Sequence, residues 1–197
     1  MKSFSFYLIL LLAMSCASEA SDSSKPKDEN EKFPKVNLKD YKTVKFEEEF
    51  EILILKELTL SSKESDKAIL GYSHLSKEKH VYIEKEFVAH YSKSLKARNI
   101  SPKSILESFA KEHLNDFKRV LKQSTESKFE KSKVGKLDCL RSSFDGDSYG
   151  FPRTKYFSVR YFITDAFIYT FMTWTVSASK KAFSDESLAM GLSLKTI

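Results

Sequence analysis

Apolar residues recur at every second position in one run of the C-terminal third of the chain. In KYFSVRYFIT, every second residue from Phe157 to Ile163 is apolar, and a period of two predicts a β-strand. The run AFIYTFMTWTV that follows is rich in the β-branched and aromatic residues that favour strands. Asp165-Ala166 between the two runs predicts a turn, so that the two strands form an antiparallel hairpin.

Shorter strand-like runs precede this hairpin. Apolar residues alternate with polar ones from Phe46 to Ile54, which predicts one strand. KAILGYSHL and HVYIEK predict a second hairpin around a turn at residues 76–79. Gly135 separates two further strand-like runs.

Other segments change to the period of a helix. The range 102–123 is the clearest, because its apolar residues form one stripe. Ser101 can cap this helix, and Pro102 suits the first helical position. EFVAHYSKSLKA predicts a short helix, and a last helix is expected to begin near residues 177–179.

The order of these elements predicts the fold class. Strands, helix, strands and helix follow one another with short turns between neighbouring strands, which favours an α+β domain with a mostly antiparallel sheet flanked by helices. A hydrophobic content of 41%, with 16 Phe and 9 Tyr, is enough for a packed core.

The chain opens with an apolar run, MKSFSFYLILLLAMSCAS, that changes abruptly to polar residues. The run holds about ten apolar residues after the cationic Lys2, which suits a signal peptide, whereas a membrane span needs roughly 20. Leu12-Ala13-Met14-Ser15-Cys16 resembles a bacterial lipobox, in which Cys16 is acylated and becomes the first residue. Ordinary cleavage at the small residues before Cys16 is the alternative.

The sequence therefore divides into three parts. Residues 1–15 are expected to be a signal peptide, and residues 16–43 a lipidated cysteine with a flexible, Ser-, Lys- and Glu-rich tether. Residues 44–197 are expected to form one domain. Because Ala17 follows the cysteine in place of a retaining Asp, the outer membrane of a bacterial cell envelope is the favoured location, with the acylated Cys16 as the contact to the membrane.

Charge and motifs exclude several functions. The net charge is +6, but Lys and Glu are interspersed, as on a solvated surface. Without a basic-aromatic recognition motif, nucleic acid is not an expected partner. The sequence holds no nucleophile elbow, P-loop or zinc-protease motif, so we expect no enzyme and no cofactor. Cys139 is expected to be a small buried apolar residue.

Two weak metal patterns have simpler interpretations. Asp145-Gly146 and Asp147 resemble the start of a calcium loop, but the remaining ligands are missing, so a tight turn in the loop DGDSYGFPRT is preferred. His74 and His80 flank a predicted turn, where a two-histidine metal site is the alternative to exposed histidines. No metal is expected.

Four residues are candidates for binding. Trp174 shares a strand face with Met172, and packing beneath the last helix is preferred over a place on a binding surface. Arg141 and Arg160 lie on predicted central strands, where they either pair with Asp or Glu or line a pocket. Tyr149 belongs to the predicted loop.

Several stretches resemble one known family. They are LGYSHLSKEKHVYIEKE, ILESFAKEHLNDFKRVLK, KVGKLDCLRSSF and YFSVRYFITDAFIYTFMTWTVSASKKAF, and together they are similar to the PsbP-like domain over roughly residues 44–197. The resemblance implies an α-β-α sandwich around an antiparallel sheet and a non-enzymatic binding or assembly role. Small bacterial lipoproteins of unknown role share this domain.

The leading hypothesis is a lipid-anchored, non-catalytic binding or assembly protein with a protein partner in the cell envelope. A carrier of a small apolar or lipid-like ligand is the alternative, motivated by the many aromatic residues. A hydrolase with an unrecognised arrangement is the third hypothesis.

Overall fold

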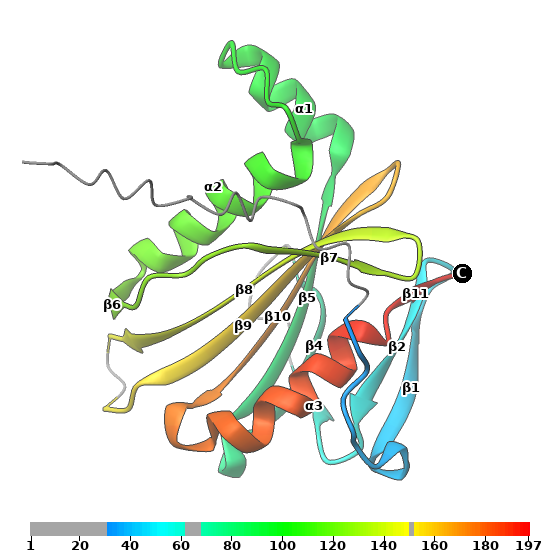
Figure 1. Cartoon of the computed structure of the whole chain (residues 1–197), viewed down its shortest axis with the longest axis vertical. Coiled ribbons are helices and arrows are strands. Elements are labelled where there is room, and N and C mark those ends of the chain that lie inside the picture. Colours follow the sequence, from blue (N-terminus) through cyan, green and yellow to red (C-terminus); the bar gives the residue numbers. More distant parts are fainter. Residues whose placement is uncertain (1–30, 62–67, 150–151) are drawn as a thin grey trace, which may run out of the picture.

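A long antiparallel sheet forms the middle layer of the protein (Figure 1). This computed structural model describes residues 31–61, 68–149 and 152–197. Within these residues the sheet has the order β3-β4-β5-β10-β9-β8-β6, and β7 also pairs with β8. Its strands are β3 (Thr59–Leu60), β4 (Ala68–His74), β5 (Lys79–Phe87), β6 (Leu121–Ser124), β7 (Glu130–Val134), β8 (Leu137–Ser148), β9 (Lys155–Ile163) and β10 (Phe167–Val176).

Helices and a small second sheet cover this layer. Figure 1 shows α3 lying across one face of the long sheet, with β1 and β2 beside it. The remaining elements are η1 (Leu38–Asp40), β1 (Tyr41–Phe46), β2 (Phe50–Leu55), η2 (Leu75–Lys77), α1 (Val88–Ala97), α2 (Ile105–Arg119), η3 (Ser177–Ser179), α3 (Lys180–Leu192) and β11 (Lys195–Thr196), which joins β1 and β2 in a second antiparallel sheet.

The long sheet has a hydrophobic core on each face. Successive side chains of a strand point to opposite faces, so Tyr161 packs toward α1 and α2, whereas Phe162 packs toward α3. The face under α1 and α2 also buries Leu106 and Leu114 of α2. The protein is therefore an α+β sandwich with helices on both sides of an antiparallel sheet, which confirms the predicted fold class.

Several predicted elements are confirmed. The hairpin of β9 and β10 turns at residues 164–166, and β4 and β5 form the second predicted hairpin around η2. Gly135, with a φ of 61°, lies in the turn between β7 and β8. The short helix is α1, and the last helix follows η3 at Ser177–Ser179.

Other predicted boundaries were wrong for identifiable reasons. The helix expected at 102–123 begins at Ile105, because the Ser104 side chain caps it by accepting a hydrogen bond from Glu107 N at 3.3 Å, and it ends at Arg119. Ser104 and Glu107 have the spacing of a capping box, and this signal gives the start of the helix correctly, whereas Pro102 does not.

The strand expected from Phe46 to Ile54 is two strands. Three successive glutamates form the turn between β1 and β2, and Glu47 takes a φ of 48° there. Asp145-Gly146 is no turn, since β8 continues through both residues to Ser148. The loop DGDSYGFPRT is accordingly much shorter than expected.

The folded part begins before residue 44. β1 starts at Tyr41, which is buried, and the side chain of Val36 packs against the core beneath α3. Residues 31–43, which the sequence assigned to the tether, thus lie against the domain. No helix among the described residues combines the length and apolarity needed to cross a membrane.

Helix α3 contains a glycine where it packs on the inner strand β9. A Cβ at Gly191 would lie 2.6 Å from Arg160 Cδ and 2.8 Å from Arg160 Nε. The Arg160 side chain is only 3% exposed and is held by an ion pair, so it cannot easily move away. Gly191 therefore provides the space that the arginine occupies.

We expect Gly191→Ala to destabilise the protein by about 1–2 kcal/mol, although alanine favours a helix by about 1 kcal/mol over glycine. Urea unfolding followed by circular dichroism measures this. Lys181→Ala, on the exposed side of the same helix, is the control and should change stability by less than about 0.5 kcal/mol. A Gly191→Ala protein as stable as the wild type would show that Arg160 moves aside freely.

Candidate functional site

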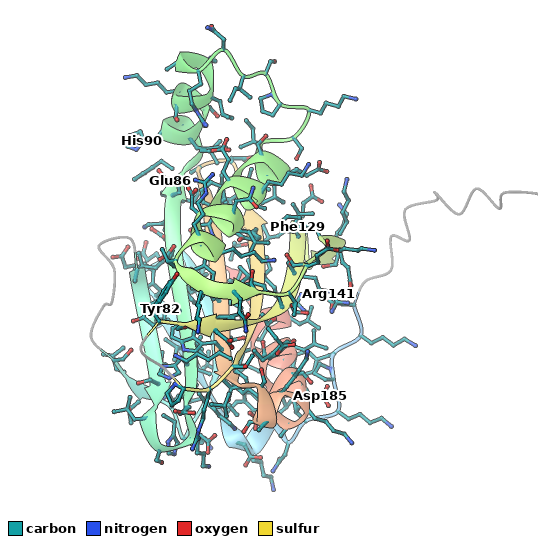
Figure 2. The ribbon with its side chains drawn as sticks, turned by 90° about the vertical axis from the view of Figure 1, so that its left-hand side faces the viewer. Tyr82, Glu86, His90, Phe129, Arg141 and Asp185 are labelled. Carbon is teal, nitrogen blue, oxygen red and sulfur yellow. The ribbon has the colours of Figure 1, made fainter. Side chains whose placement is uncertain are left out.

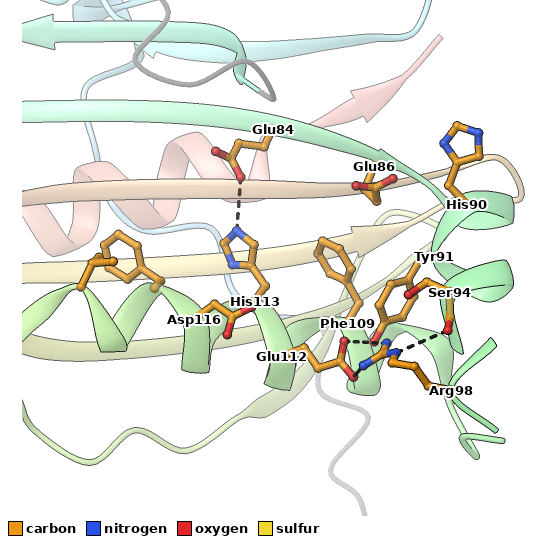
Figure 3. Close-up of a pocket in the computed structure, with 12 residues that line it drawn as sticks. Glu84, Glu86, His90, Tyr91, Ser94, Arg98, Phe109, Glu112, His113 and Asp116 are labelled. Atoms are coloured by element: carbon orange, nitrogen blue, oxygen red, sulfur yellow. Dashed lines mark hydrogen bonds and ion pairs between the residues drawn. The ribbon is translucent and has the colours of Figure 1, made fainter. Parts of the chain in front are cut away.

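A groove runs along α2 on the face of the sheet opposite α3. It has two connected chambers, of about 750 and 310 Å³, which share Glu84, His113, Phe117 and Val120. The larger chamber lies between α1, α2 and β5, and the smaller one lies beyond the end of α2, over the ends of β9 and β10. Figure 3 shows the larger chamber, with side chains from both helices and from β5 pointing into it.

The larger chamber combines carboxylates with aromatic rings. Its lining consists of Glu84, Glu86, His90, Tyr91, Ser94, Arg98, Phe109, Glu112, His113, Asp116, Phe117 and Val120. Four of these residues are acidic, and Arg98 is the single Lys or Arg among them. A groove of negative charge therefore lies on a chain whose net charge is +6.

Arg98 neutralises one of the four acidic residues of this chamber, Glu112. Its guanidinium donates to both carboxylate oxygens of Glu112, at 2.9 and 3.1 Å (Figure 3). The hydrogen bonds from Arg98 lower the pKa of Glu112, so this carboxyl remains ionised. Burial and the neighbouring Glu112 carboxylate raise the pKa of Tyr91 to about 12. Tyr91 thus stays a neutral hydroxyl at the edge of the chamber.

His113 lies in the middle of the groove, and both of its ring nitrogens are occupied. Nδ1 lies 3.1 Å from the Tyr161 hydroxyl. Nε2 lies 3.2 Å from a carboxylate oxygen of Glu84, and Figure 3 shows this second contact. A carboxylate can only accept, so Nε2 carries a hydrogen and donates to Glu84. In the neutral imidazole Nδ1 then accepts from the Tyr161 hydroxyl, which keeps its proton because burial raises its pKa far above the usual value.

This arrangement suits recognition better than catalysis. A histidine acts as a general base toward a group that the substrate can reach, and the hydroxyl on Nδ1 belongs to Tyr161, which is fully buried. Glu84, His113 and Tyr161 instead fix the shape and charge at the centre of the groove.

The smaller chamber is mostly apolar, and Trp174 lies in its wall. It is lined by Tyr82, Glu84, His113, Phe117, Val120, Leu121, Ser148, Lys155, Phe157, Met172 and Trp174. The Trp174 ring stacks on His80, with centroids 4.7 Å apart and planes 3° from parallel. Trp174 shares its face with Met172, as predicted, but the expected packing beneath the last helix was wrong, because this face lies under α1 and α2.

Arg141 and Arg160 lie on the other face, as directly opposed residues of β8 and β9. Both bind Glu31. Arg160 donates to its two carboxylate oxygens at 2.7 and 3.2 Å, and Arg141 pairs with it as well. Burial alone would raise the pKa of Glu31, but hydrogen bonds and charge from the two arginines lower it. Figure 2 shows Arg141 and Asp185 on one side of the molecule and Tyr82, Glu86 and His90 on the other.

The remaining sequence candidates do not belong to either site. Tyr149 is 70% exposed and lines no part of the groove. The two-histidine metal site is wrong, because His80 pairs with Ser73 across the hairpin, which turns His74 to the opposite face. Cys139 is buried, as expected, and burial raises its thiol pKa. Cys16 lies outside the described residues.

The sequence contains a signal for His113, which was not among the predicted site residues. Phe109, His113 and Phe117 recur every four residues and share one face of α2, so a polar histidine on an apolar stripe could have been noticed. Glu31 offered no such signal, because its partner Arg160 is 129 positions away.

The comparisons with known proteins identify the fold. No family of proteins and no curated protein sequence matches the chain. The solution structure of cyanobacterial PsbP (CyanoP) from Synechocystis sp. PCC 6803 superposes with a TM-score of 0.51 at 9% identity, over 83% of this chain and 96% of that one. The Saccharomyces cerevisiae Ran-binding protein Mog1p gives a TM-score of 0.45 at 7% identity, over 79% and 94%. The chain thus has a PsbP-like fold, as the resemblance implied.

We expect Tyr161→Phe to destabilise the protein by about 1 kcal/mol, because it leaves His113 Nδ1 without its donor. The midpoint of urea unfolding measures this. Tyr41→Phe is the matched control. Its buried hydroxyl has no hydrogen-bond partner among the described residues, so its removal should be neutral or slightly stabilising. Equal losses in both variants would contradict the assigned hydrogen bond.

Proposed function

We propose that this chain is a lipid-anchored, non-catalytic binding protein of a bacterial cell envelope, and that its groove binds a basic segment of a protein partner. One observation supports this above the others. The groove beside α2 has four carboxylates and one arginine in its larger chamber, on a chain of net charge +6. Because the groove carries negative charge, it favours a cationic partner.

The apolar part of the groove suits the same partner. Phe109 and Phe117 line the larger chamber between the acidic residues. Lys and Arg side chains place their methylene stems on such rings while their charged ends reach carboxylates. Glu86 and Asp116 offer those carboxylates on β5 and α2, on the two sides of the groove.

The non-catalytic role rests on His113. A substrate could use this imidazole only by displacing Tyr161 or Glu84, each of which holds one ring nitrogen. The sequence contains no nucleophile motif.

The anchor belongs to the same proposal. Cys16 follows the apolar run of a signal peptide and precedes a polar segment, so acylation there would hold the domain at a membrane. Two or three acyl chains bind a bilayer far more strongly than one. The outer membrane is the favoured location.

A carrier of a small apolar ligand is the second candidate. The smaller chamber, of about 310 Å³, is lined mainly by apolar and aromatic side chains that include Phe157, Met172 and Trp174. This volume is at the lower end of the range for small-molecule sites. In the leading proposal the same chamber takes an apolar side chain of the partner segment.

A photo-cross-linker at Val120 tests the groove. This residue is 65% exposed and lines both chambers. We expect p-benzoylphenylalanine at this position to cross-link one protein in native membranes. Glu86→Lys combined with Asp116→Lys should lower the yield about tenfold or more, because like charges oppose a basic segment.

Glu47→Lys combined with Glu48→Lys is the matched control for this experiment, since it changes the net charge equally and both residues are exposed in the turn between β1 and β2. It should leave the cross-link unchanged. An equal loss in both charge-reversed proteins would exclude the groove as the docking surface. A cross-link to a lipid or another small molecule would favour the carrier.

Acylation of Cys16 is tested by mass spectrometry of the N-terminal peptide from the mature protein. We expect an N-terminal cysteine carrying acyl chains, and a protein that partitions into the detergent phase. Cys16→Ser should abolish both properties. An unmodified N-terminus produced by cleavage at another position would contradict the anchor while leaving the groove proposal standing.

A further inference from the structure

The arginine pair on the face under α3 forms a second recognition site. Arg141 and Arg160 are directly opposed on β8 and β9, and both line a pocket of about 300 Å³ between the sheet and α3. The same pocket contains Ser143 and Ser158, which are directly opposed on these strands, and Ser184 of α3. Guanidinium and hydroxyl groups together are the donors that recognise a carboxylate.

A carboxylate already occupies these arginines. The Glu31 side chain is 15% exposed, and its two oxygens both bind Arg160, while Arg141 reaches one of them. Arg141 also pairs with Glu130, which is 62% exposed at the rim. The pair therefore binds an oxyanion in the bidentate manner that guanidinium groups favour.

The segment that provides Glu31 is weakly held. Residues 31–37 form neither helix nor strand, so no ladder of backbone hydrogen bonds fixes them to the sheet. Arg160 is in the opposite situation, since its side chain is only 3% exposed on the central strand β9. A buried guanidinium needs an anion at all times, but no strand pairing holds the segment that supplies it, so another carboxylate can take the place of Glu31.

One buried polar atom supports an exchangeable ligand. Arg160 Nε has no hydrogen-bond partner among the described residues, and Arg160 lines the pocket. The pocket contains three cations, including Lys128, against the carboxylates of Glu130 and Asp185. It therefore has an excess of positive charge whenever Glu31 is absent.

We infer that the Arg141–Arg160 pair is a carboxylate-binding site, which Glu31 fills from within the chain and which an external carboxylate fills when the N-terminal segment withdraws. The external group is either a small carboxylic acid or an acidic side chain of a protein partner. This site is independent of the groove, because it lies on the opposite face of the sheet.

Chemical rescue tests the site in the full chain. Glu31→Ala removes the carboxylate and leaves space for acetate. At pH 7 we expect this variant to melt below the wild type, and sodium acetate to raise its melting temperature by about 2–4 °C over sodium chloride of equal ionic strength. Glu107→Ala is the control. It removes the carboxylate partner of Lys131, outside the pocket, and should show no gain specific to acetate.

A second measurement covers the case in which Glu31→Ala does not fold. Glu31→Gln keeps the size of the side chain and removes its charge. The NMR signal of the Arg160 Nε–H group should then shift saturably with acetate in this variant, at a concentration at least about tenfold below that needed in the wild type, where Glu31 competes for the site. The inference is overturned if neither variant responds to acetate beyond its response to chloride, or if the wild type responds equally.

A peptide with the sequence of residues 28–36, DENEKFPKV, is compared with acetate to distinguish the two possible sources of the carboxylate. An acidic protein segment is the ligand if the peptide acts on Glu31→Ala at a concentration at least about tenfold below that of acetate. A small carboxylic acid is the ligand if the two act at similar concentrations. Both results support the site itself.

Discussion

Both faces of the long sheet are buried, and this constraint determines where the other elements lie. Side chains alternate between the faces, so Tyr161 of β9 belongs to one core and Phe162 to the other. An antiparallel sheet often leaves one face to water, but strands with aromatic residues on both sides cannot. One face is therefore covered by α1 and α2, and the other by α3 together with the sheet of β1, β2 and β11. The groove exists because α1 and α2 leave part of their face uncovered.

Arg160 is a charged residue buried on one of these apolar faces. Its need for a carboxylate partner explains why the folded part begins as early as Glu31. A charge on the central strand β9 must be paired, since burying an isolated guanidinium costs several kcal/mol. Gly191 makes room for the side chain within α3, and Glu31 provides the carboxylate. A residue in a stretch with the composition of a linker thereby becomes part of the domain. Losing one partner of such a pair typically costs about 3–5 kcal/mol of stability. The contact between Glu31 and Arg160 therefore affects folding strongly, although it involves few atoms.

Local patterns predicted the fold, whereas the sites depend on contacts between distant residues. The period of two in KYFSVRYFIT determined the hairpin of β9 and β10, because alternation is a property of neighbouring residues. The same period placed Trp174 with Met172, but it could not tell which helix covers that face. His113 was recognisable from its place between Phe109 and Phe117. Glu31 was not, since nothing in a polar segment indicates a partner 129 residues away.

The two sites lie on opposite faces, and this bears on how an anchored protein would present them. Glu31 fixes the N-terminal segment on the side of α3, fifteen residues after Cys16. That length spans at most about 50 Å when fully extended. A chain that is acylated at Cys16 would therefore be tied to the membrane from the α3 side, and the acidic groove would remain open to a partner on the other side. Release of Glu31 would move the point of attachment toward β1 and lengthen the tether. A carboxylate at the arginine pair would then change how far the groove can reach without altering the groove itself.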